Sequence, residues 1–199
     1  MPKFTKIPQD TFENLQLDAG VLLKNFDPEA ATEPADEDII TATTGGINIT
    51  CIPTYSDMGK DVDNCPANML ELKKLDSWEC KIAFTALDAS AENIALALGA
   101  ADVSGDKVVP RRSIKTTDFK DIWWVGDTAS GGMVAVKLMN ALSTGGFSFQ
   151  STKNGKGQLS VELTGHVSLA NQDVMPMEFY SASATAEVPA QSTNNNPED

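Results

Sequence analysis

The feature that most restricts the fold is a run of alternating polar and apolar residues from Gln158 to Leu169. Because successive side chains of a strand point to opposite faces, this run predicts one long strand with a polar and an apolar face. The apolar face carries Leu159, Val161, Leu163, Val167 and Leu169. Such a strand is typical of an antiparallel sheet with one face on a core and the other toward water or a water-filled space.

Several other segments show the same strand pattern, separated by turn residues. The strands predicted by pattern and punctuation are 15–26, 47–51, 78–86, 122–125, 133–142, 147–150 and 175–180. Directly after 78–86, apolar residues recur at helical spacing between a Ser90 cap and a Gly99 stop, which predicts one helix. The sequence therefore predicts a mainly β protein, an antiparallel β-sandwich or barrel with one flanking α-helix.

The 199 residues and their 41% hydrophobic content are enough for one domain with one core. We expect an N-terminal arm over residues 1–14 and a β domain over residues 15–180. The tail of residues 181–199 is rich in Ser, Ala, Thr, Asn and Pro, and this composition predicts disorder. The acidic segments 27–38 and 57–68 are predicted to be solvated loops.

Charge excludes some functions. Fifteen basic residues against 28 acidic ones leave a net charge of −13, which argues against tight binding to nucleic acid phosphates and against contact with anionic membranes. No apolar run approaches the length of a membrane span, and Met1 to Asp10 lacks the apolar stretch of a signal peptide. We expect no membrane partner and synthesis in the cytoplasm.

Catalytic and metal-binding patterns are weak. With one histidine and no recognisable nucleophile motif, the chain predicts no enzyme and no cofactor. Asp57, Asp61 and Asp63 are close in sequence, but they lack the glycine and the later ligand of a calcium loop, so a solvated acidic loop is favoured over a metal site. The three cysteines contain no CxxC pair, and Cys51 and Cys80 are interpreted as buried small hydrophobic residues.

Two features indicate assembly. Trp123 and Trp124 are neighbours on a predicted strand, so at most one is expected in the core. The other is either an interface residue, which we favour, or part of a sugar-binding platform. Long antiparallel strands also leave unpaired edges, and copies joined head to tail in a closed ring would pair each edge with the next subunit.

The order of elements adds a resemblance. A Trp-containing strand precedes an Ala-rich helix, and then come the strand and turn Asp121 to Asp127, the strand 133–142, Gly146 to Phe149, the long strand from Gln158 and the final Met175 to Tyr180. From Leu15 to Tyr180 the chain resembles the major tail tube proteins of long, non-contractile-tailed bacteriophages. The resemblance implies a virion protein without catalytic residues, a β-sandwich that forms stacked hexameric rings around a lumen. Its partners would be further copies of itself, the tape measure protein and the tail terminator and distal tail proteins, while genomic DNA passes through the lumen without tight binding.

Candidate site residues follow from combining the pattern with the resemblance. The polar face of the long strand is predicted to line the lumen with Gln158, Ser160, Glu162, Thr164 and His166. The acidic loops supply the candidate ring-stacking residues Asp27, Glu33, Asp36, Asp57, Asp61 and Asp63. Two alternatives stay open: a carbohydrate-binding β-sandwich domain, and the inner tube of a contractile injection system or phage-like bacteriocin.

Overall fold

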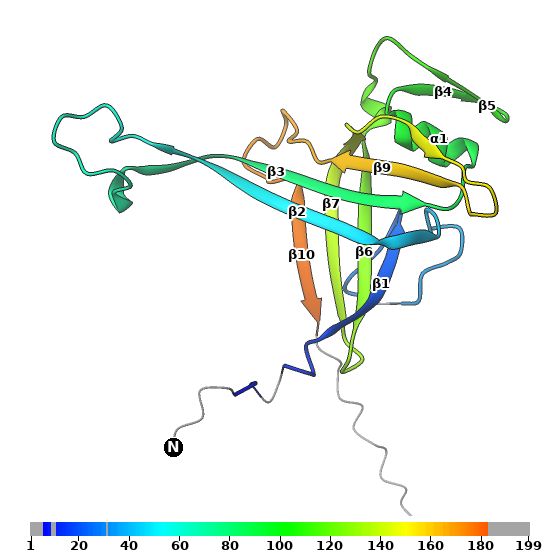
Figure 1. Ribbon diagram of the computed structural model, residues 1–199, viewed down its shortest axis with the longest axis horizontal. Helices are drawn as coiled ribbons and strands as arrows, with labels where there is room; N and C mark the ends of the chain where they lie inside the picture. Colours follow the sequence, from blue (N-terminus) through cyan, green and yellow to red (C-terminus); the bar gives the residue numbers. More distant parts are fainter. Residues whose placement is uncertain (1–5, 9–10, 31, 183–199) are drawn as a thin grey trace, which may run out of the picture.

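Two antiparallel β-sheets that cross one another dominate the computed structural model, which describes residues 6–8, 11–30 and 32–182 (Figure 1). The upright sheet consists of β1 (Gln16–Leu23), β6 (Lys120–Thr128), β7 (Met133–Ser143) and β10 (Met177–Ala182). The hairpin sheet consists of β2 (Thr43–Asp57), β3 (Lys73–Ala86), β9 (Gln158–Thr164) and β8 (Ser148–Gln150). The predicted mainly β fold with one α-helix is confirmed.

The smaller elements lie at the ends of the sheets. They are α1 (Ala91–Leu98), the separate hairpin of β4 (Ala101–Ser104) and β5 (Lys107–Pro110), and the short 3-10 helices η1 (Leu70–Leu72) and η2 (Thr116–Asp118). The predicted limits of α1 are confirmed, since the Ser90 side chain accepts a hydrogen bond from the Asn93 N–H and Gly99 has a φ of 75°. The β4–β5 hairpin was not predicted.

Strand β7 joins the two sheets. Most of it pairs with β6 and β10 in the upright sheet, but Leu142 and Ser143 pair with Thr164 and Leu163 of β9. The pairing of β6 with β7 shifts register before this point, and Asn140 has a φ of 47°. Irregularities of this kind bend a strand, so β7 can serve both sheets.

The core lies between the two sheets. Its largest fully buried side chains come from both of them, which confirms the predicted inward face of β9. They include Leu22, Ile82, Ile122, Leu138, Leu159 and Leu163. The buried Ala97 of α1 also packs into this core.

The predicted strand from Gln158 to Leu169 is too long, because β9 ends at Thr164. At Gly165 the chain lies so close to the upright sheet that an added Cβ would be 2.6 Å from Leu138 Cδ1. Beyond it, Val167 and Leu169 are exposed. The polar–apolar alternation of the sequence therefore continues past Thr164, although the strand has ended.

Trp123 and Trp124 are both buried, so the prediction that at most one lies in a core is wrong. Trp124 packs in the main core, whereas Trp123 lies on the other face of the upright sheet in a second apolar cluster. Phe26 covers Trp123 edge-on with ring centroids 5.7 Å apart, and the Tyr180 ring lies 5.5 Å away. The chain after β1 thus covers a face that the sequence left open.

Other predicted limits shift slightly. The tail was predicted to begin at Ser181, but Ser181 and Ala182 are the last residues of β10. The rest of that tail, residues 183–199, lies outside the described residues, as do residues 1–5 and 9–10 of the predicted N-terminal arm.

Candidate functional site

The most unusual feature is a hairpin that extends beyond its own sheet (Figure 1). Strand β3 pairs with β9 only from Lys81 to Ala86, whereas it pairs with β2 along its whole length. The outer parts, residues 51–57 and 73–80, therefore form a ribbon of two strands that ends in the loop 58–72. We call residues 51–80 the arm. The sequence predicted short strands and a solvated loop here, because Pro53 and the acidic residues near Asp57 hid the continued pairing.

One face of the arm continues the core face of the hairpin sheet. Directly paired residues of antiparallel strands place their side chains on the same face, and each strand repeats that face at every second residue. The pair of Ile49 and Ile82 is followed outward by three further pairs on this face. They are Cys51 with Cys80, Pro53 with Trp78 and, after a register shift that leaves one extra residue in β3, Tyr55 with Leu75.

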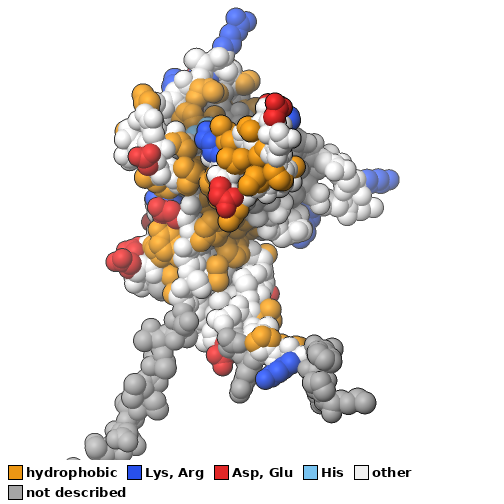
Figure 2. Space-filling view, turned by 90° about the vertical axis from the view of Figure 1, so that its left-hand side faces the viewer, with side chains coloured by type: hydrophobic (Ala, Val, Ile, Leu, Met, Phe, Trp, Pro, Cys, Tyr) orange, Lys and Arg blue, Asp and Glu red, His pale blue; other side chains and the backbone are white. Residues whose placement is uncertain are grey.

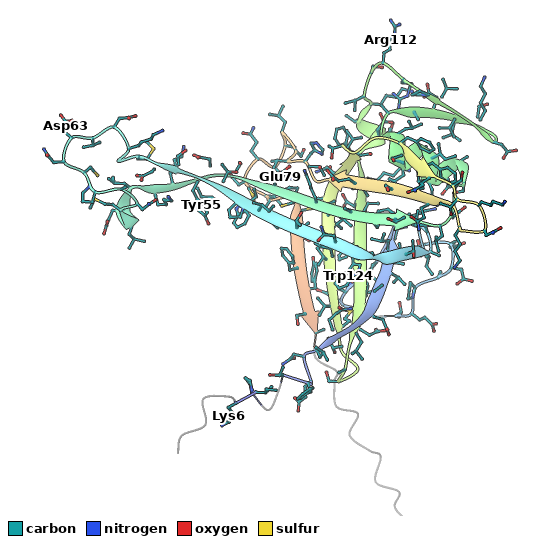
Figure 3. All side chains as sticks on the ribbon, viewed as in Figure 1. Lys6, Tyr55, Asp63, Glu79, Arg112 and Trp124 are labelled. Atoms are coloured by element: carbon teal, nitrogen blue, oxygen red, sulfur yellow. The ribbon has the colours of Figure 1, made fainter. Side chains whose placement is uncertain are left out.

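Exposure rises steadily along this face. Ile82 is 0% exposed, Trp78 is 36% exposed and Tyr55 is 53% exposed. We call Pro53, Tyr55, Leu75 and Trp78 the arm's underside. Tyr55, Leu75 and Trp78 are exposed and Pro53 is half-buried. Figure 3 shows Tyr55 on the side of the arm toward β10. The apolar face of the hairpin thus extends beyond the elements that cover it in the core.

The arm ends in a tip loop that carries exposed apolar groups, and Figure 2 shows hydrophobic side chains around the tip and on the surface beneath it. The large exposed ones in the loop are Met58, Val62, Met69 and Leu70. The Asp57 carboxylate accepts hydrogen bonds from the backbone N–H groups of Asn68 (2.9 Å) and Gly59 (3.0 Å). These bonds hold the pKa of Asp57 below its ordinary value of 3.8, so the charged carboxylate fixes the loop.

The predicted ring-stacking residues fall into two groups. Asp57, Asp61 and Asp63 belong to the tip of the arm, with Asp63 labelled at its far end in Figure 3. Asp27, Glu33 and Asp36 instead come between Phe26 and Ile39, the two residues after β1 that pack in the Trp123 cluster. In this second group, Asp27 accepts a hydrogen bond from the Glu29 N–H, while Glu33 and Asp36 are exposed. The structure does not bring the two groups together.

Four of the five predicted lumen residues share one face of β9. Gln158, Ser160, Glu162 and Thr164 alternate with the buried residues of this strand and point away from the core. His166 does not belong to this face, which corrects the prediction. It lies beyond the end of β9, with its ring 5.3 Å from the Phe119 ring and its Nδ1 3.1 Å from the Asn140 carbonyl oxygen.

Charges on this polar face are paired. Lys81 Nζ lies 2.6 Å from a Glu79 carboxylate oxygen and 3.4 Å from a Glu162 oxygen. The hydrogen bond that Lys81 donates to Glu79, and then the interactions with Glu162, raise the pKa of Lys81. Thr144 and Thr164 add hydroxyl groups 2.7 Å apart beside Glu162. The face therefore offers hydroxyls and a cation that is held between two carboxylates.

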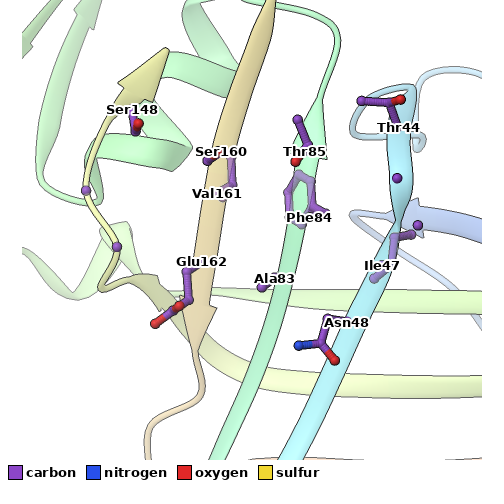
Figure 4. Close-up of a pocket in the computed structure, with 14 residues that line it drawn as sticks. Thr44, Ile47, Asn48, Ala83, Phe84, Thr85, Ser148, Ser160, Val161 and Glu162 are labelled. Atoms are coloured by element: carbon purple, nitrogen blue, oxygen red, sulfur yellow. The ribbon is translucent and has the colours of Figure 1, made fainter. Parts of the chain in front are cut away.

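A groove of about 570 Å³ runs along this face between β9, β3 and the start of β2 (Figure 4). Among its lining residues, Glu162 is the one ionisable side chain. The other polar side chains that line it are Thr44, Asn48, Thr85, Ser148 and Ser160. Glu162, whose carboxylate lies 3.4 Å from Lys81 Nζ, and these hydroxyl and amide groups give the groove the means to bind polar groups.

A further charged cluster supports the fold. The Arg111 guanidinium lies between the carboxylates of Asp102 and Asp118, which ties the β4–β5 hairpin to η2. The backbone N–H of Lys115 and then Arg111 keep the pKa of Asp118 below its ordinary value. Over the described part of the chain, no three His, Cys, Asp or Glu side chains come together as a metal-binding group.

No protein-family model matches the chain, and no curated protein matches its sequence. The described residues contain no helix with the length and apolar character needed to cross a bilayer. The arm and the polar face are the features of the molecule that bear on its function.

Proposed function

We propose that the protein is a structural virion subunit that assembles as stacked hexameric rings, forming a phage tail tube through which DNA is ejected. The observation that carries this proposal is the arm's underside, where an apolar face continues past the core and is not covered by the residues that the structure describes. The family resemblance of the element order supplies the ring and the lumen.

A second copy is the occupant that best fits the arm's underside. An isolated two-stranded hairpin is marginal in water, and contiguous exposed apolar surface on a soluble protein marks an interaction site. Contact between the arm of one copy and a different surface of the next is heterologous, and such contacts close into rings when the rotation allows it. Every copy then both gives and receives an arm.

The polar face supports a role as the wall of a DNA channel. Phosphates bind tightly where free Lys and Arg side chains release condensed counterions. On this face Lys81 is already paired with Glu79 and Glu162, and the chain as a whole carries a charge of −13. DNA would pass such a wall without being retained. The tape measure, terminator and distal tail proteins are the further partners that this role requires.

Electron microscopy of the concentrated, negatively stained protein tests the proposal. Six-fold rings or hollow tubes are the expected result. Tyr55→Lys, which places a charge on the arm's underside, should prevent them, while Val109→Lys on the β4–β5 hairpin should not, because Val109 is an exposed apolar residue outside the arm. A protein that stays monomeric at every concentration, or that binds polysaccharide as a monomer, would overturn the proposal.

A second experiment tests the channel wall. In assembled tubes, Glu162→Lys should increase retention of double-stranded DNA, and added salt should reverse the effect because phosphate contacts are salt-sensitive. Asp106→Lys is the matched control, since it makes the same charge change at the exposed turn between β4 and β5. Equal DNA retention by the two variants would place the polar face outside the lumen.

A further inference from the structure

Two cysteines face each other at the base of the arm. Cys51 of β2 and Cys80 of β3 are directly paired in register, and their Sγ atoms lie 3.0 Å apart with both thiols free. Directly opposed residues of antiparallel strands have Cα atoms roughly 4.5 or 5.5 Å apart. Both values fall in the range of about 4.4–6.8 Å that disulfides require, so the backbone already suits a bond.

The two thiols differ in access. Cys80 is buried at 1% exposure, and burial followed by the contact with Cys51 raises its pKa to about 12. Cys51 is partly exposed and lies on β2, the last strand of the hairpin sheet. A small oxidant in solution therefore reaches Cys51 first, and Cys80 is placed to resolve the product.

We propose that Cys51 and Cys80 are a modification site, where a small-molecule disulfide such as oxidised glutathione converts the pair to an intramolecular disulfide. The Cys51 thiolate attacks the oxidant, forms a mixed disulfide and releases one thiol. Cys80 then loses its proton and attacks Cys51 Sγ, which expels the second thiol. Two protein thiols are oxidised and one small disulfide is reduced to two thiols.

The position gives the bond a defined effect. The pair lies next to Lys81, where β9 stops pairing with β3, and the Cys80 carbonyl oxygen accepts a hydrogen bond from the Gly165 N–H (3.0 Å). A bond here closes a loop that contains the whole arm, and closing a loop lowers the entropy of its opened states. Oxidation therefore links the two strands of the arm covalently at its base, where pairing with β9 ends. This inference does not depend on the proposed function.

Mass spectrometry of the intact, full-length protein after incubation with oxidised glutathione tests the site. The expected product has lost about 2 Da and yields a cross-linked peptide joining Cys51 and Cys80. Cys65→Ser, a change in the tip loop, should form the same product, whereas Cys51→Ser and Cys80→Ser should not. The reaction should speed up as pH rises, because Cys80 must deprotonate to attack.

Three outcomes would overturn the proposal: persistence of all three thiols, a stable mixed disulfide at Cys51, or a bond that uses Cys65. A second measurement keeps the effect on the arm separate from the chemistry. Amide hydrogen exchange in residues 52–56 and 73–79 should slow by at least about tenfold on oxidation, while exchange in β6 should not change. Unaltered exchange in the arm would show that the disulfide does not restrict opening of the two strands.

Discussion

The inner and outer halves of the β2–β3 hairpin share two strands and one apolar face, yet they have different surroundings. The inner half, around Ile49 and Ile82, is closed in by β9 and by the upright sheet. The outer half, around Tyr55 and Leu75, has the same face and remains open. The pattern along a strand thus specifies which side is apolar, and the neighbouring elements decide whether that side becomes core or contact surface.

The largest effect should come from a cavity in the inner half. Ile82→Ala removes a fully buried side chain, and such changes lower the free energy of unfolding by about 2–5 kcal/mol. Leu75→Ala, its counterpart in the outer half, should cost less than about 1 kcal/mol in the monomer. Urea unfolding followed by tryptophan fluorescence measures both. Similar losses at the two positions would contradict the division of the hairpin.

Amide hydrogen exchange should separate the halves without mutation. In the monomer, amides of residues 54–56 should exchange at least about 100-fold faster than the ladder amides of residues 82–84, because local opening of a two-stranded ribbon leaves the core intact. Exchange monitored by mass spectrometry with peptide resolution would show this. Equal protection of the two segments would mean that the arm unfolds only with the domain.

For assembly, in contrast to monomer stability, substitutions in the outer half of the hairpin should have the larger effect. Tyr55→Lys should raise the protein concentration needed for assembly by at least about tenfold, equivalent to roughly 1.4 kcal/mol. Its effect on the stability of the monomer should stay within about 0.5 kcal/mol, as for other surface positions. Light scattering against concentration measures the first quantity and urea unfolding the second. Unchanged assembly would remove the arm's underside from the interface.

The smallest effect concerns the tip. Because the folded pKa of Asp57 is lowered, its stabilising bonds are fully present above pH 3.8 and are lost as the pH falls through the lowered value. The amide resonances of Gly59 and Asn68 should therefore titrate with a midpoint below 3.8. In Asp57→Asn, which cannot ionise, this titration should disappear. A midpoint above 3.8 would contradict the bonding described here.

Sequence pattern predicted the elements that are covered on one face. The alternation of Leu159, Val161 and Leu163 gave β9, and the Ser90 and Gly99 signals gave α1, since both depend on local periodicity and capping. Sequence pattern did not predict where a strand ends when contacts with another sheet determine its end. Gly165 lies where β9 stops, and no local signal distinguishes a strand residue from the first residue of a crossing.

The candidate site was predicted in part. The polar set of β9 was identified up to Thr164, but His166 was assigned to it because the alternation continued past the strand. The arm was missed, although one signal for it was present: the alternation of Ile49, Cys51, Pro53 and Tyr55 continues past Cys51, where the predicted strand ended. The buried Trp123 needed knowledge of the segment that folds over it.

Pro53 has a consequence for how arms can meet. It lies in β2, the last strand of its sheet, and it is paired with Trp78 of β3. Proline has no N–H to donate, and on a last strand it leaves a gap in any ladder that a foreign strand would form along that margin. Pro53 therefore disfavours amyloid-like stacking, in which arms would pair strand to strand. The partner of the arm is then selected by the shape of its side chains.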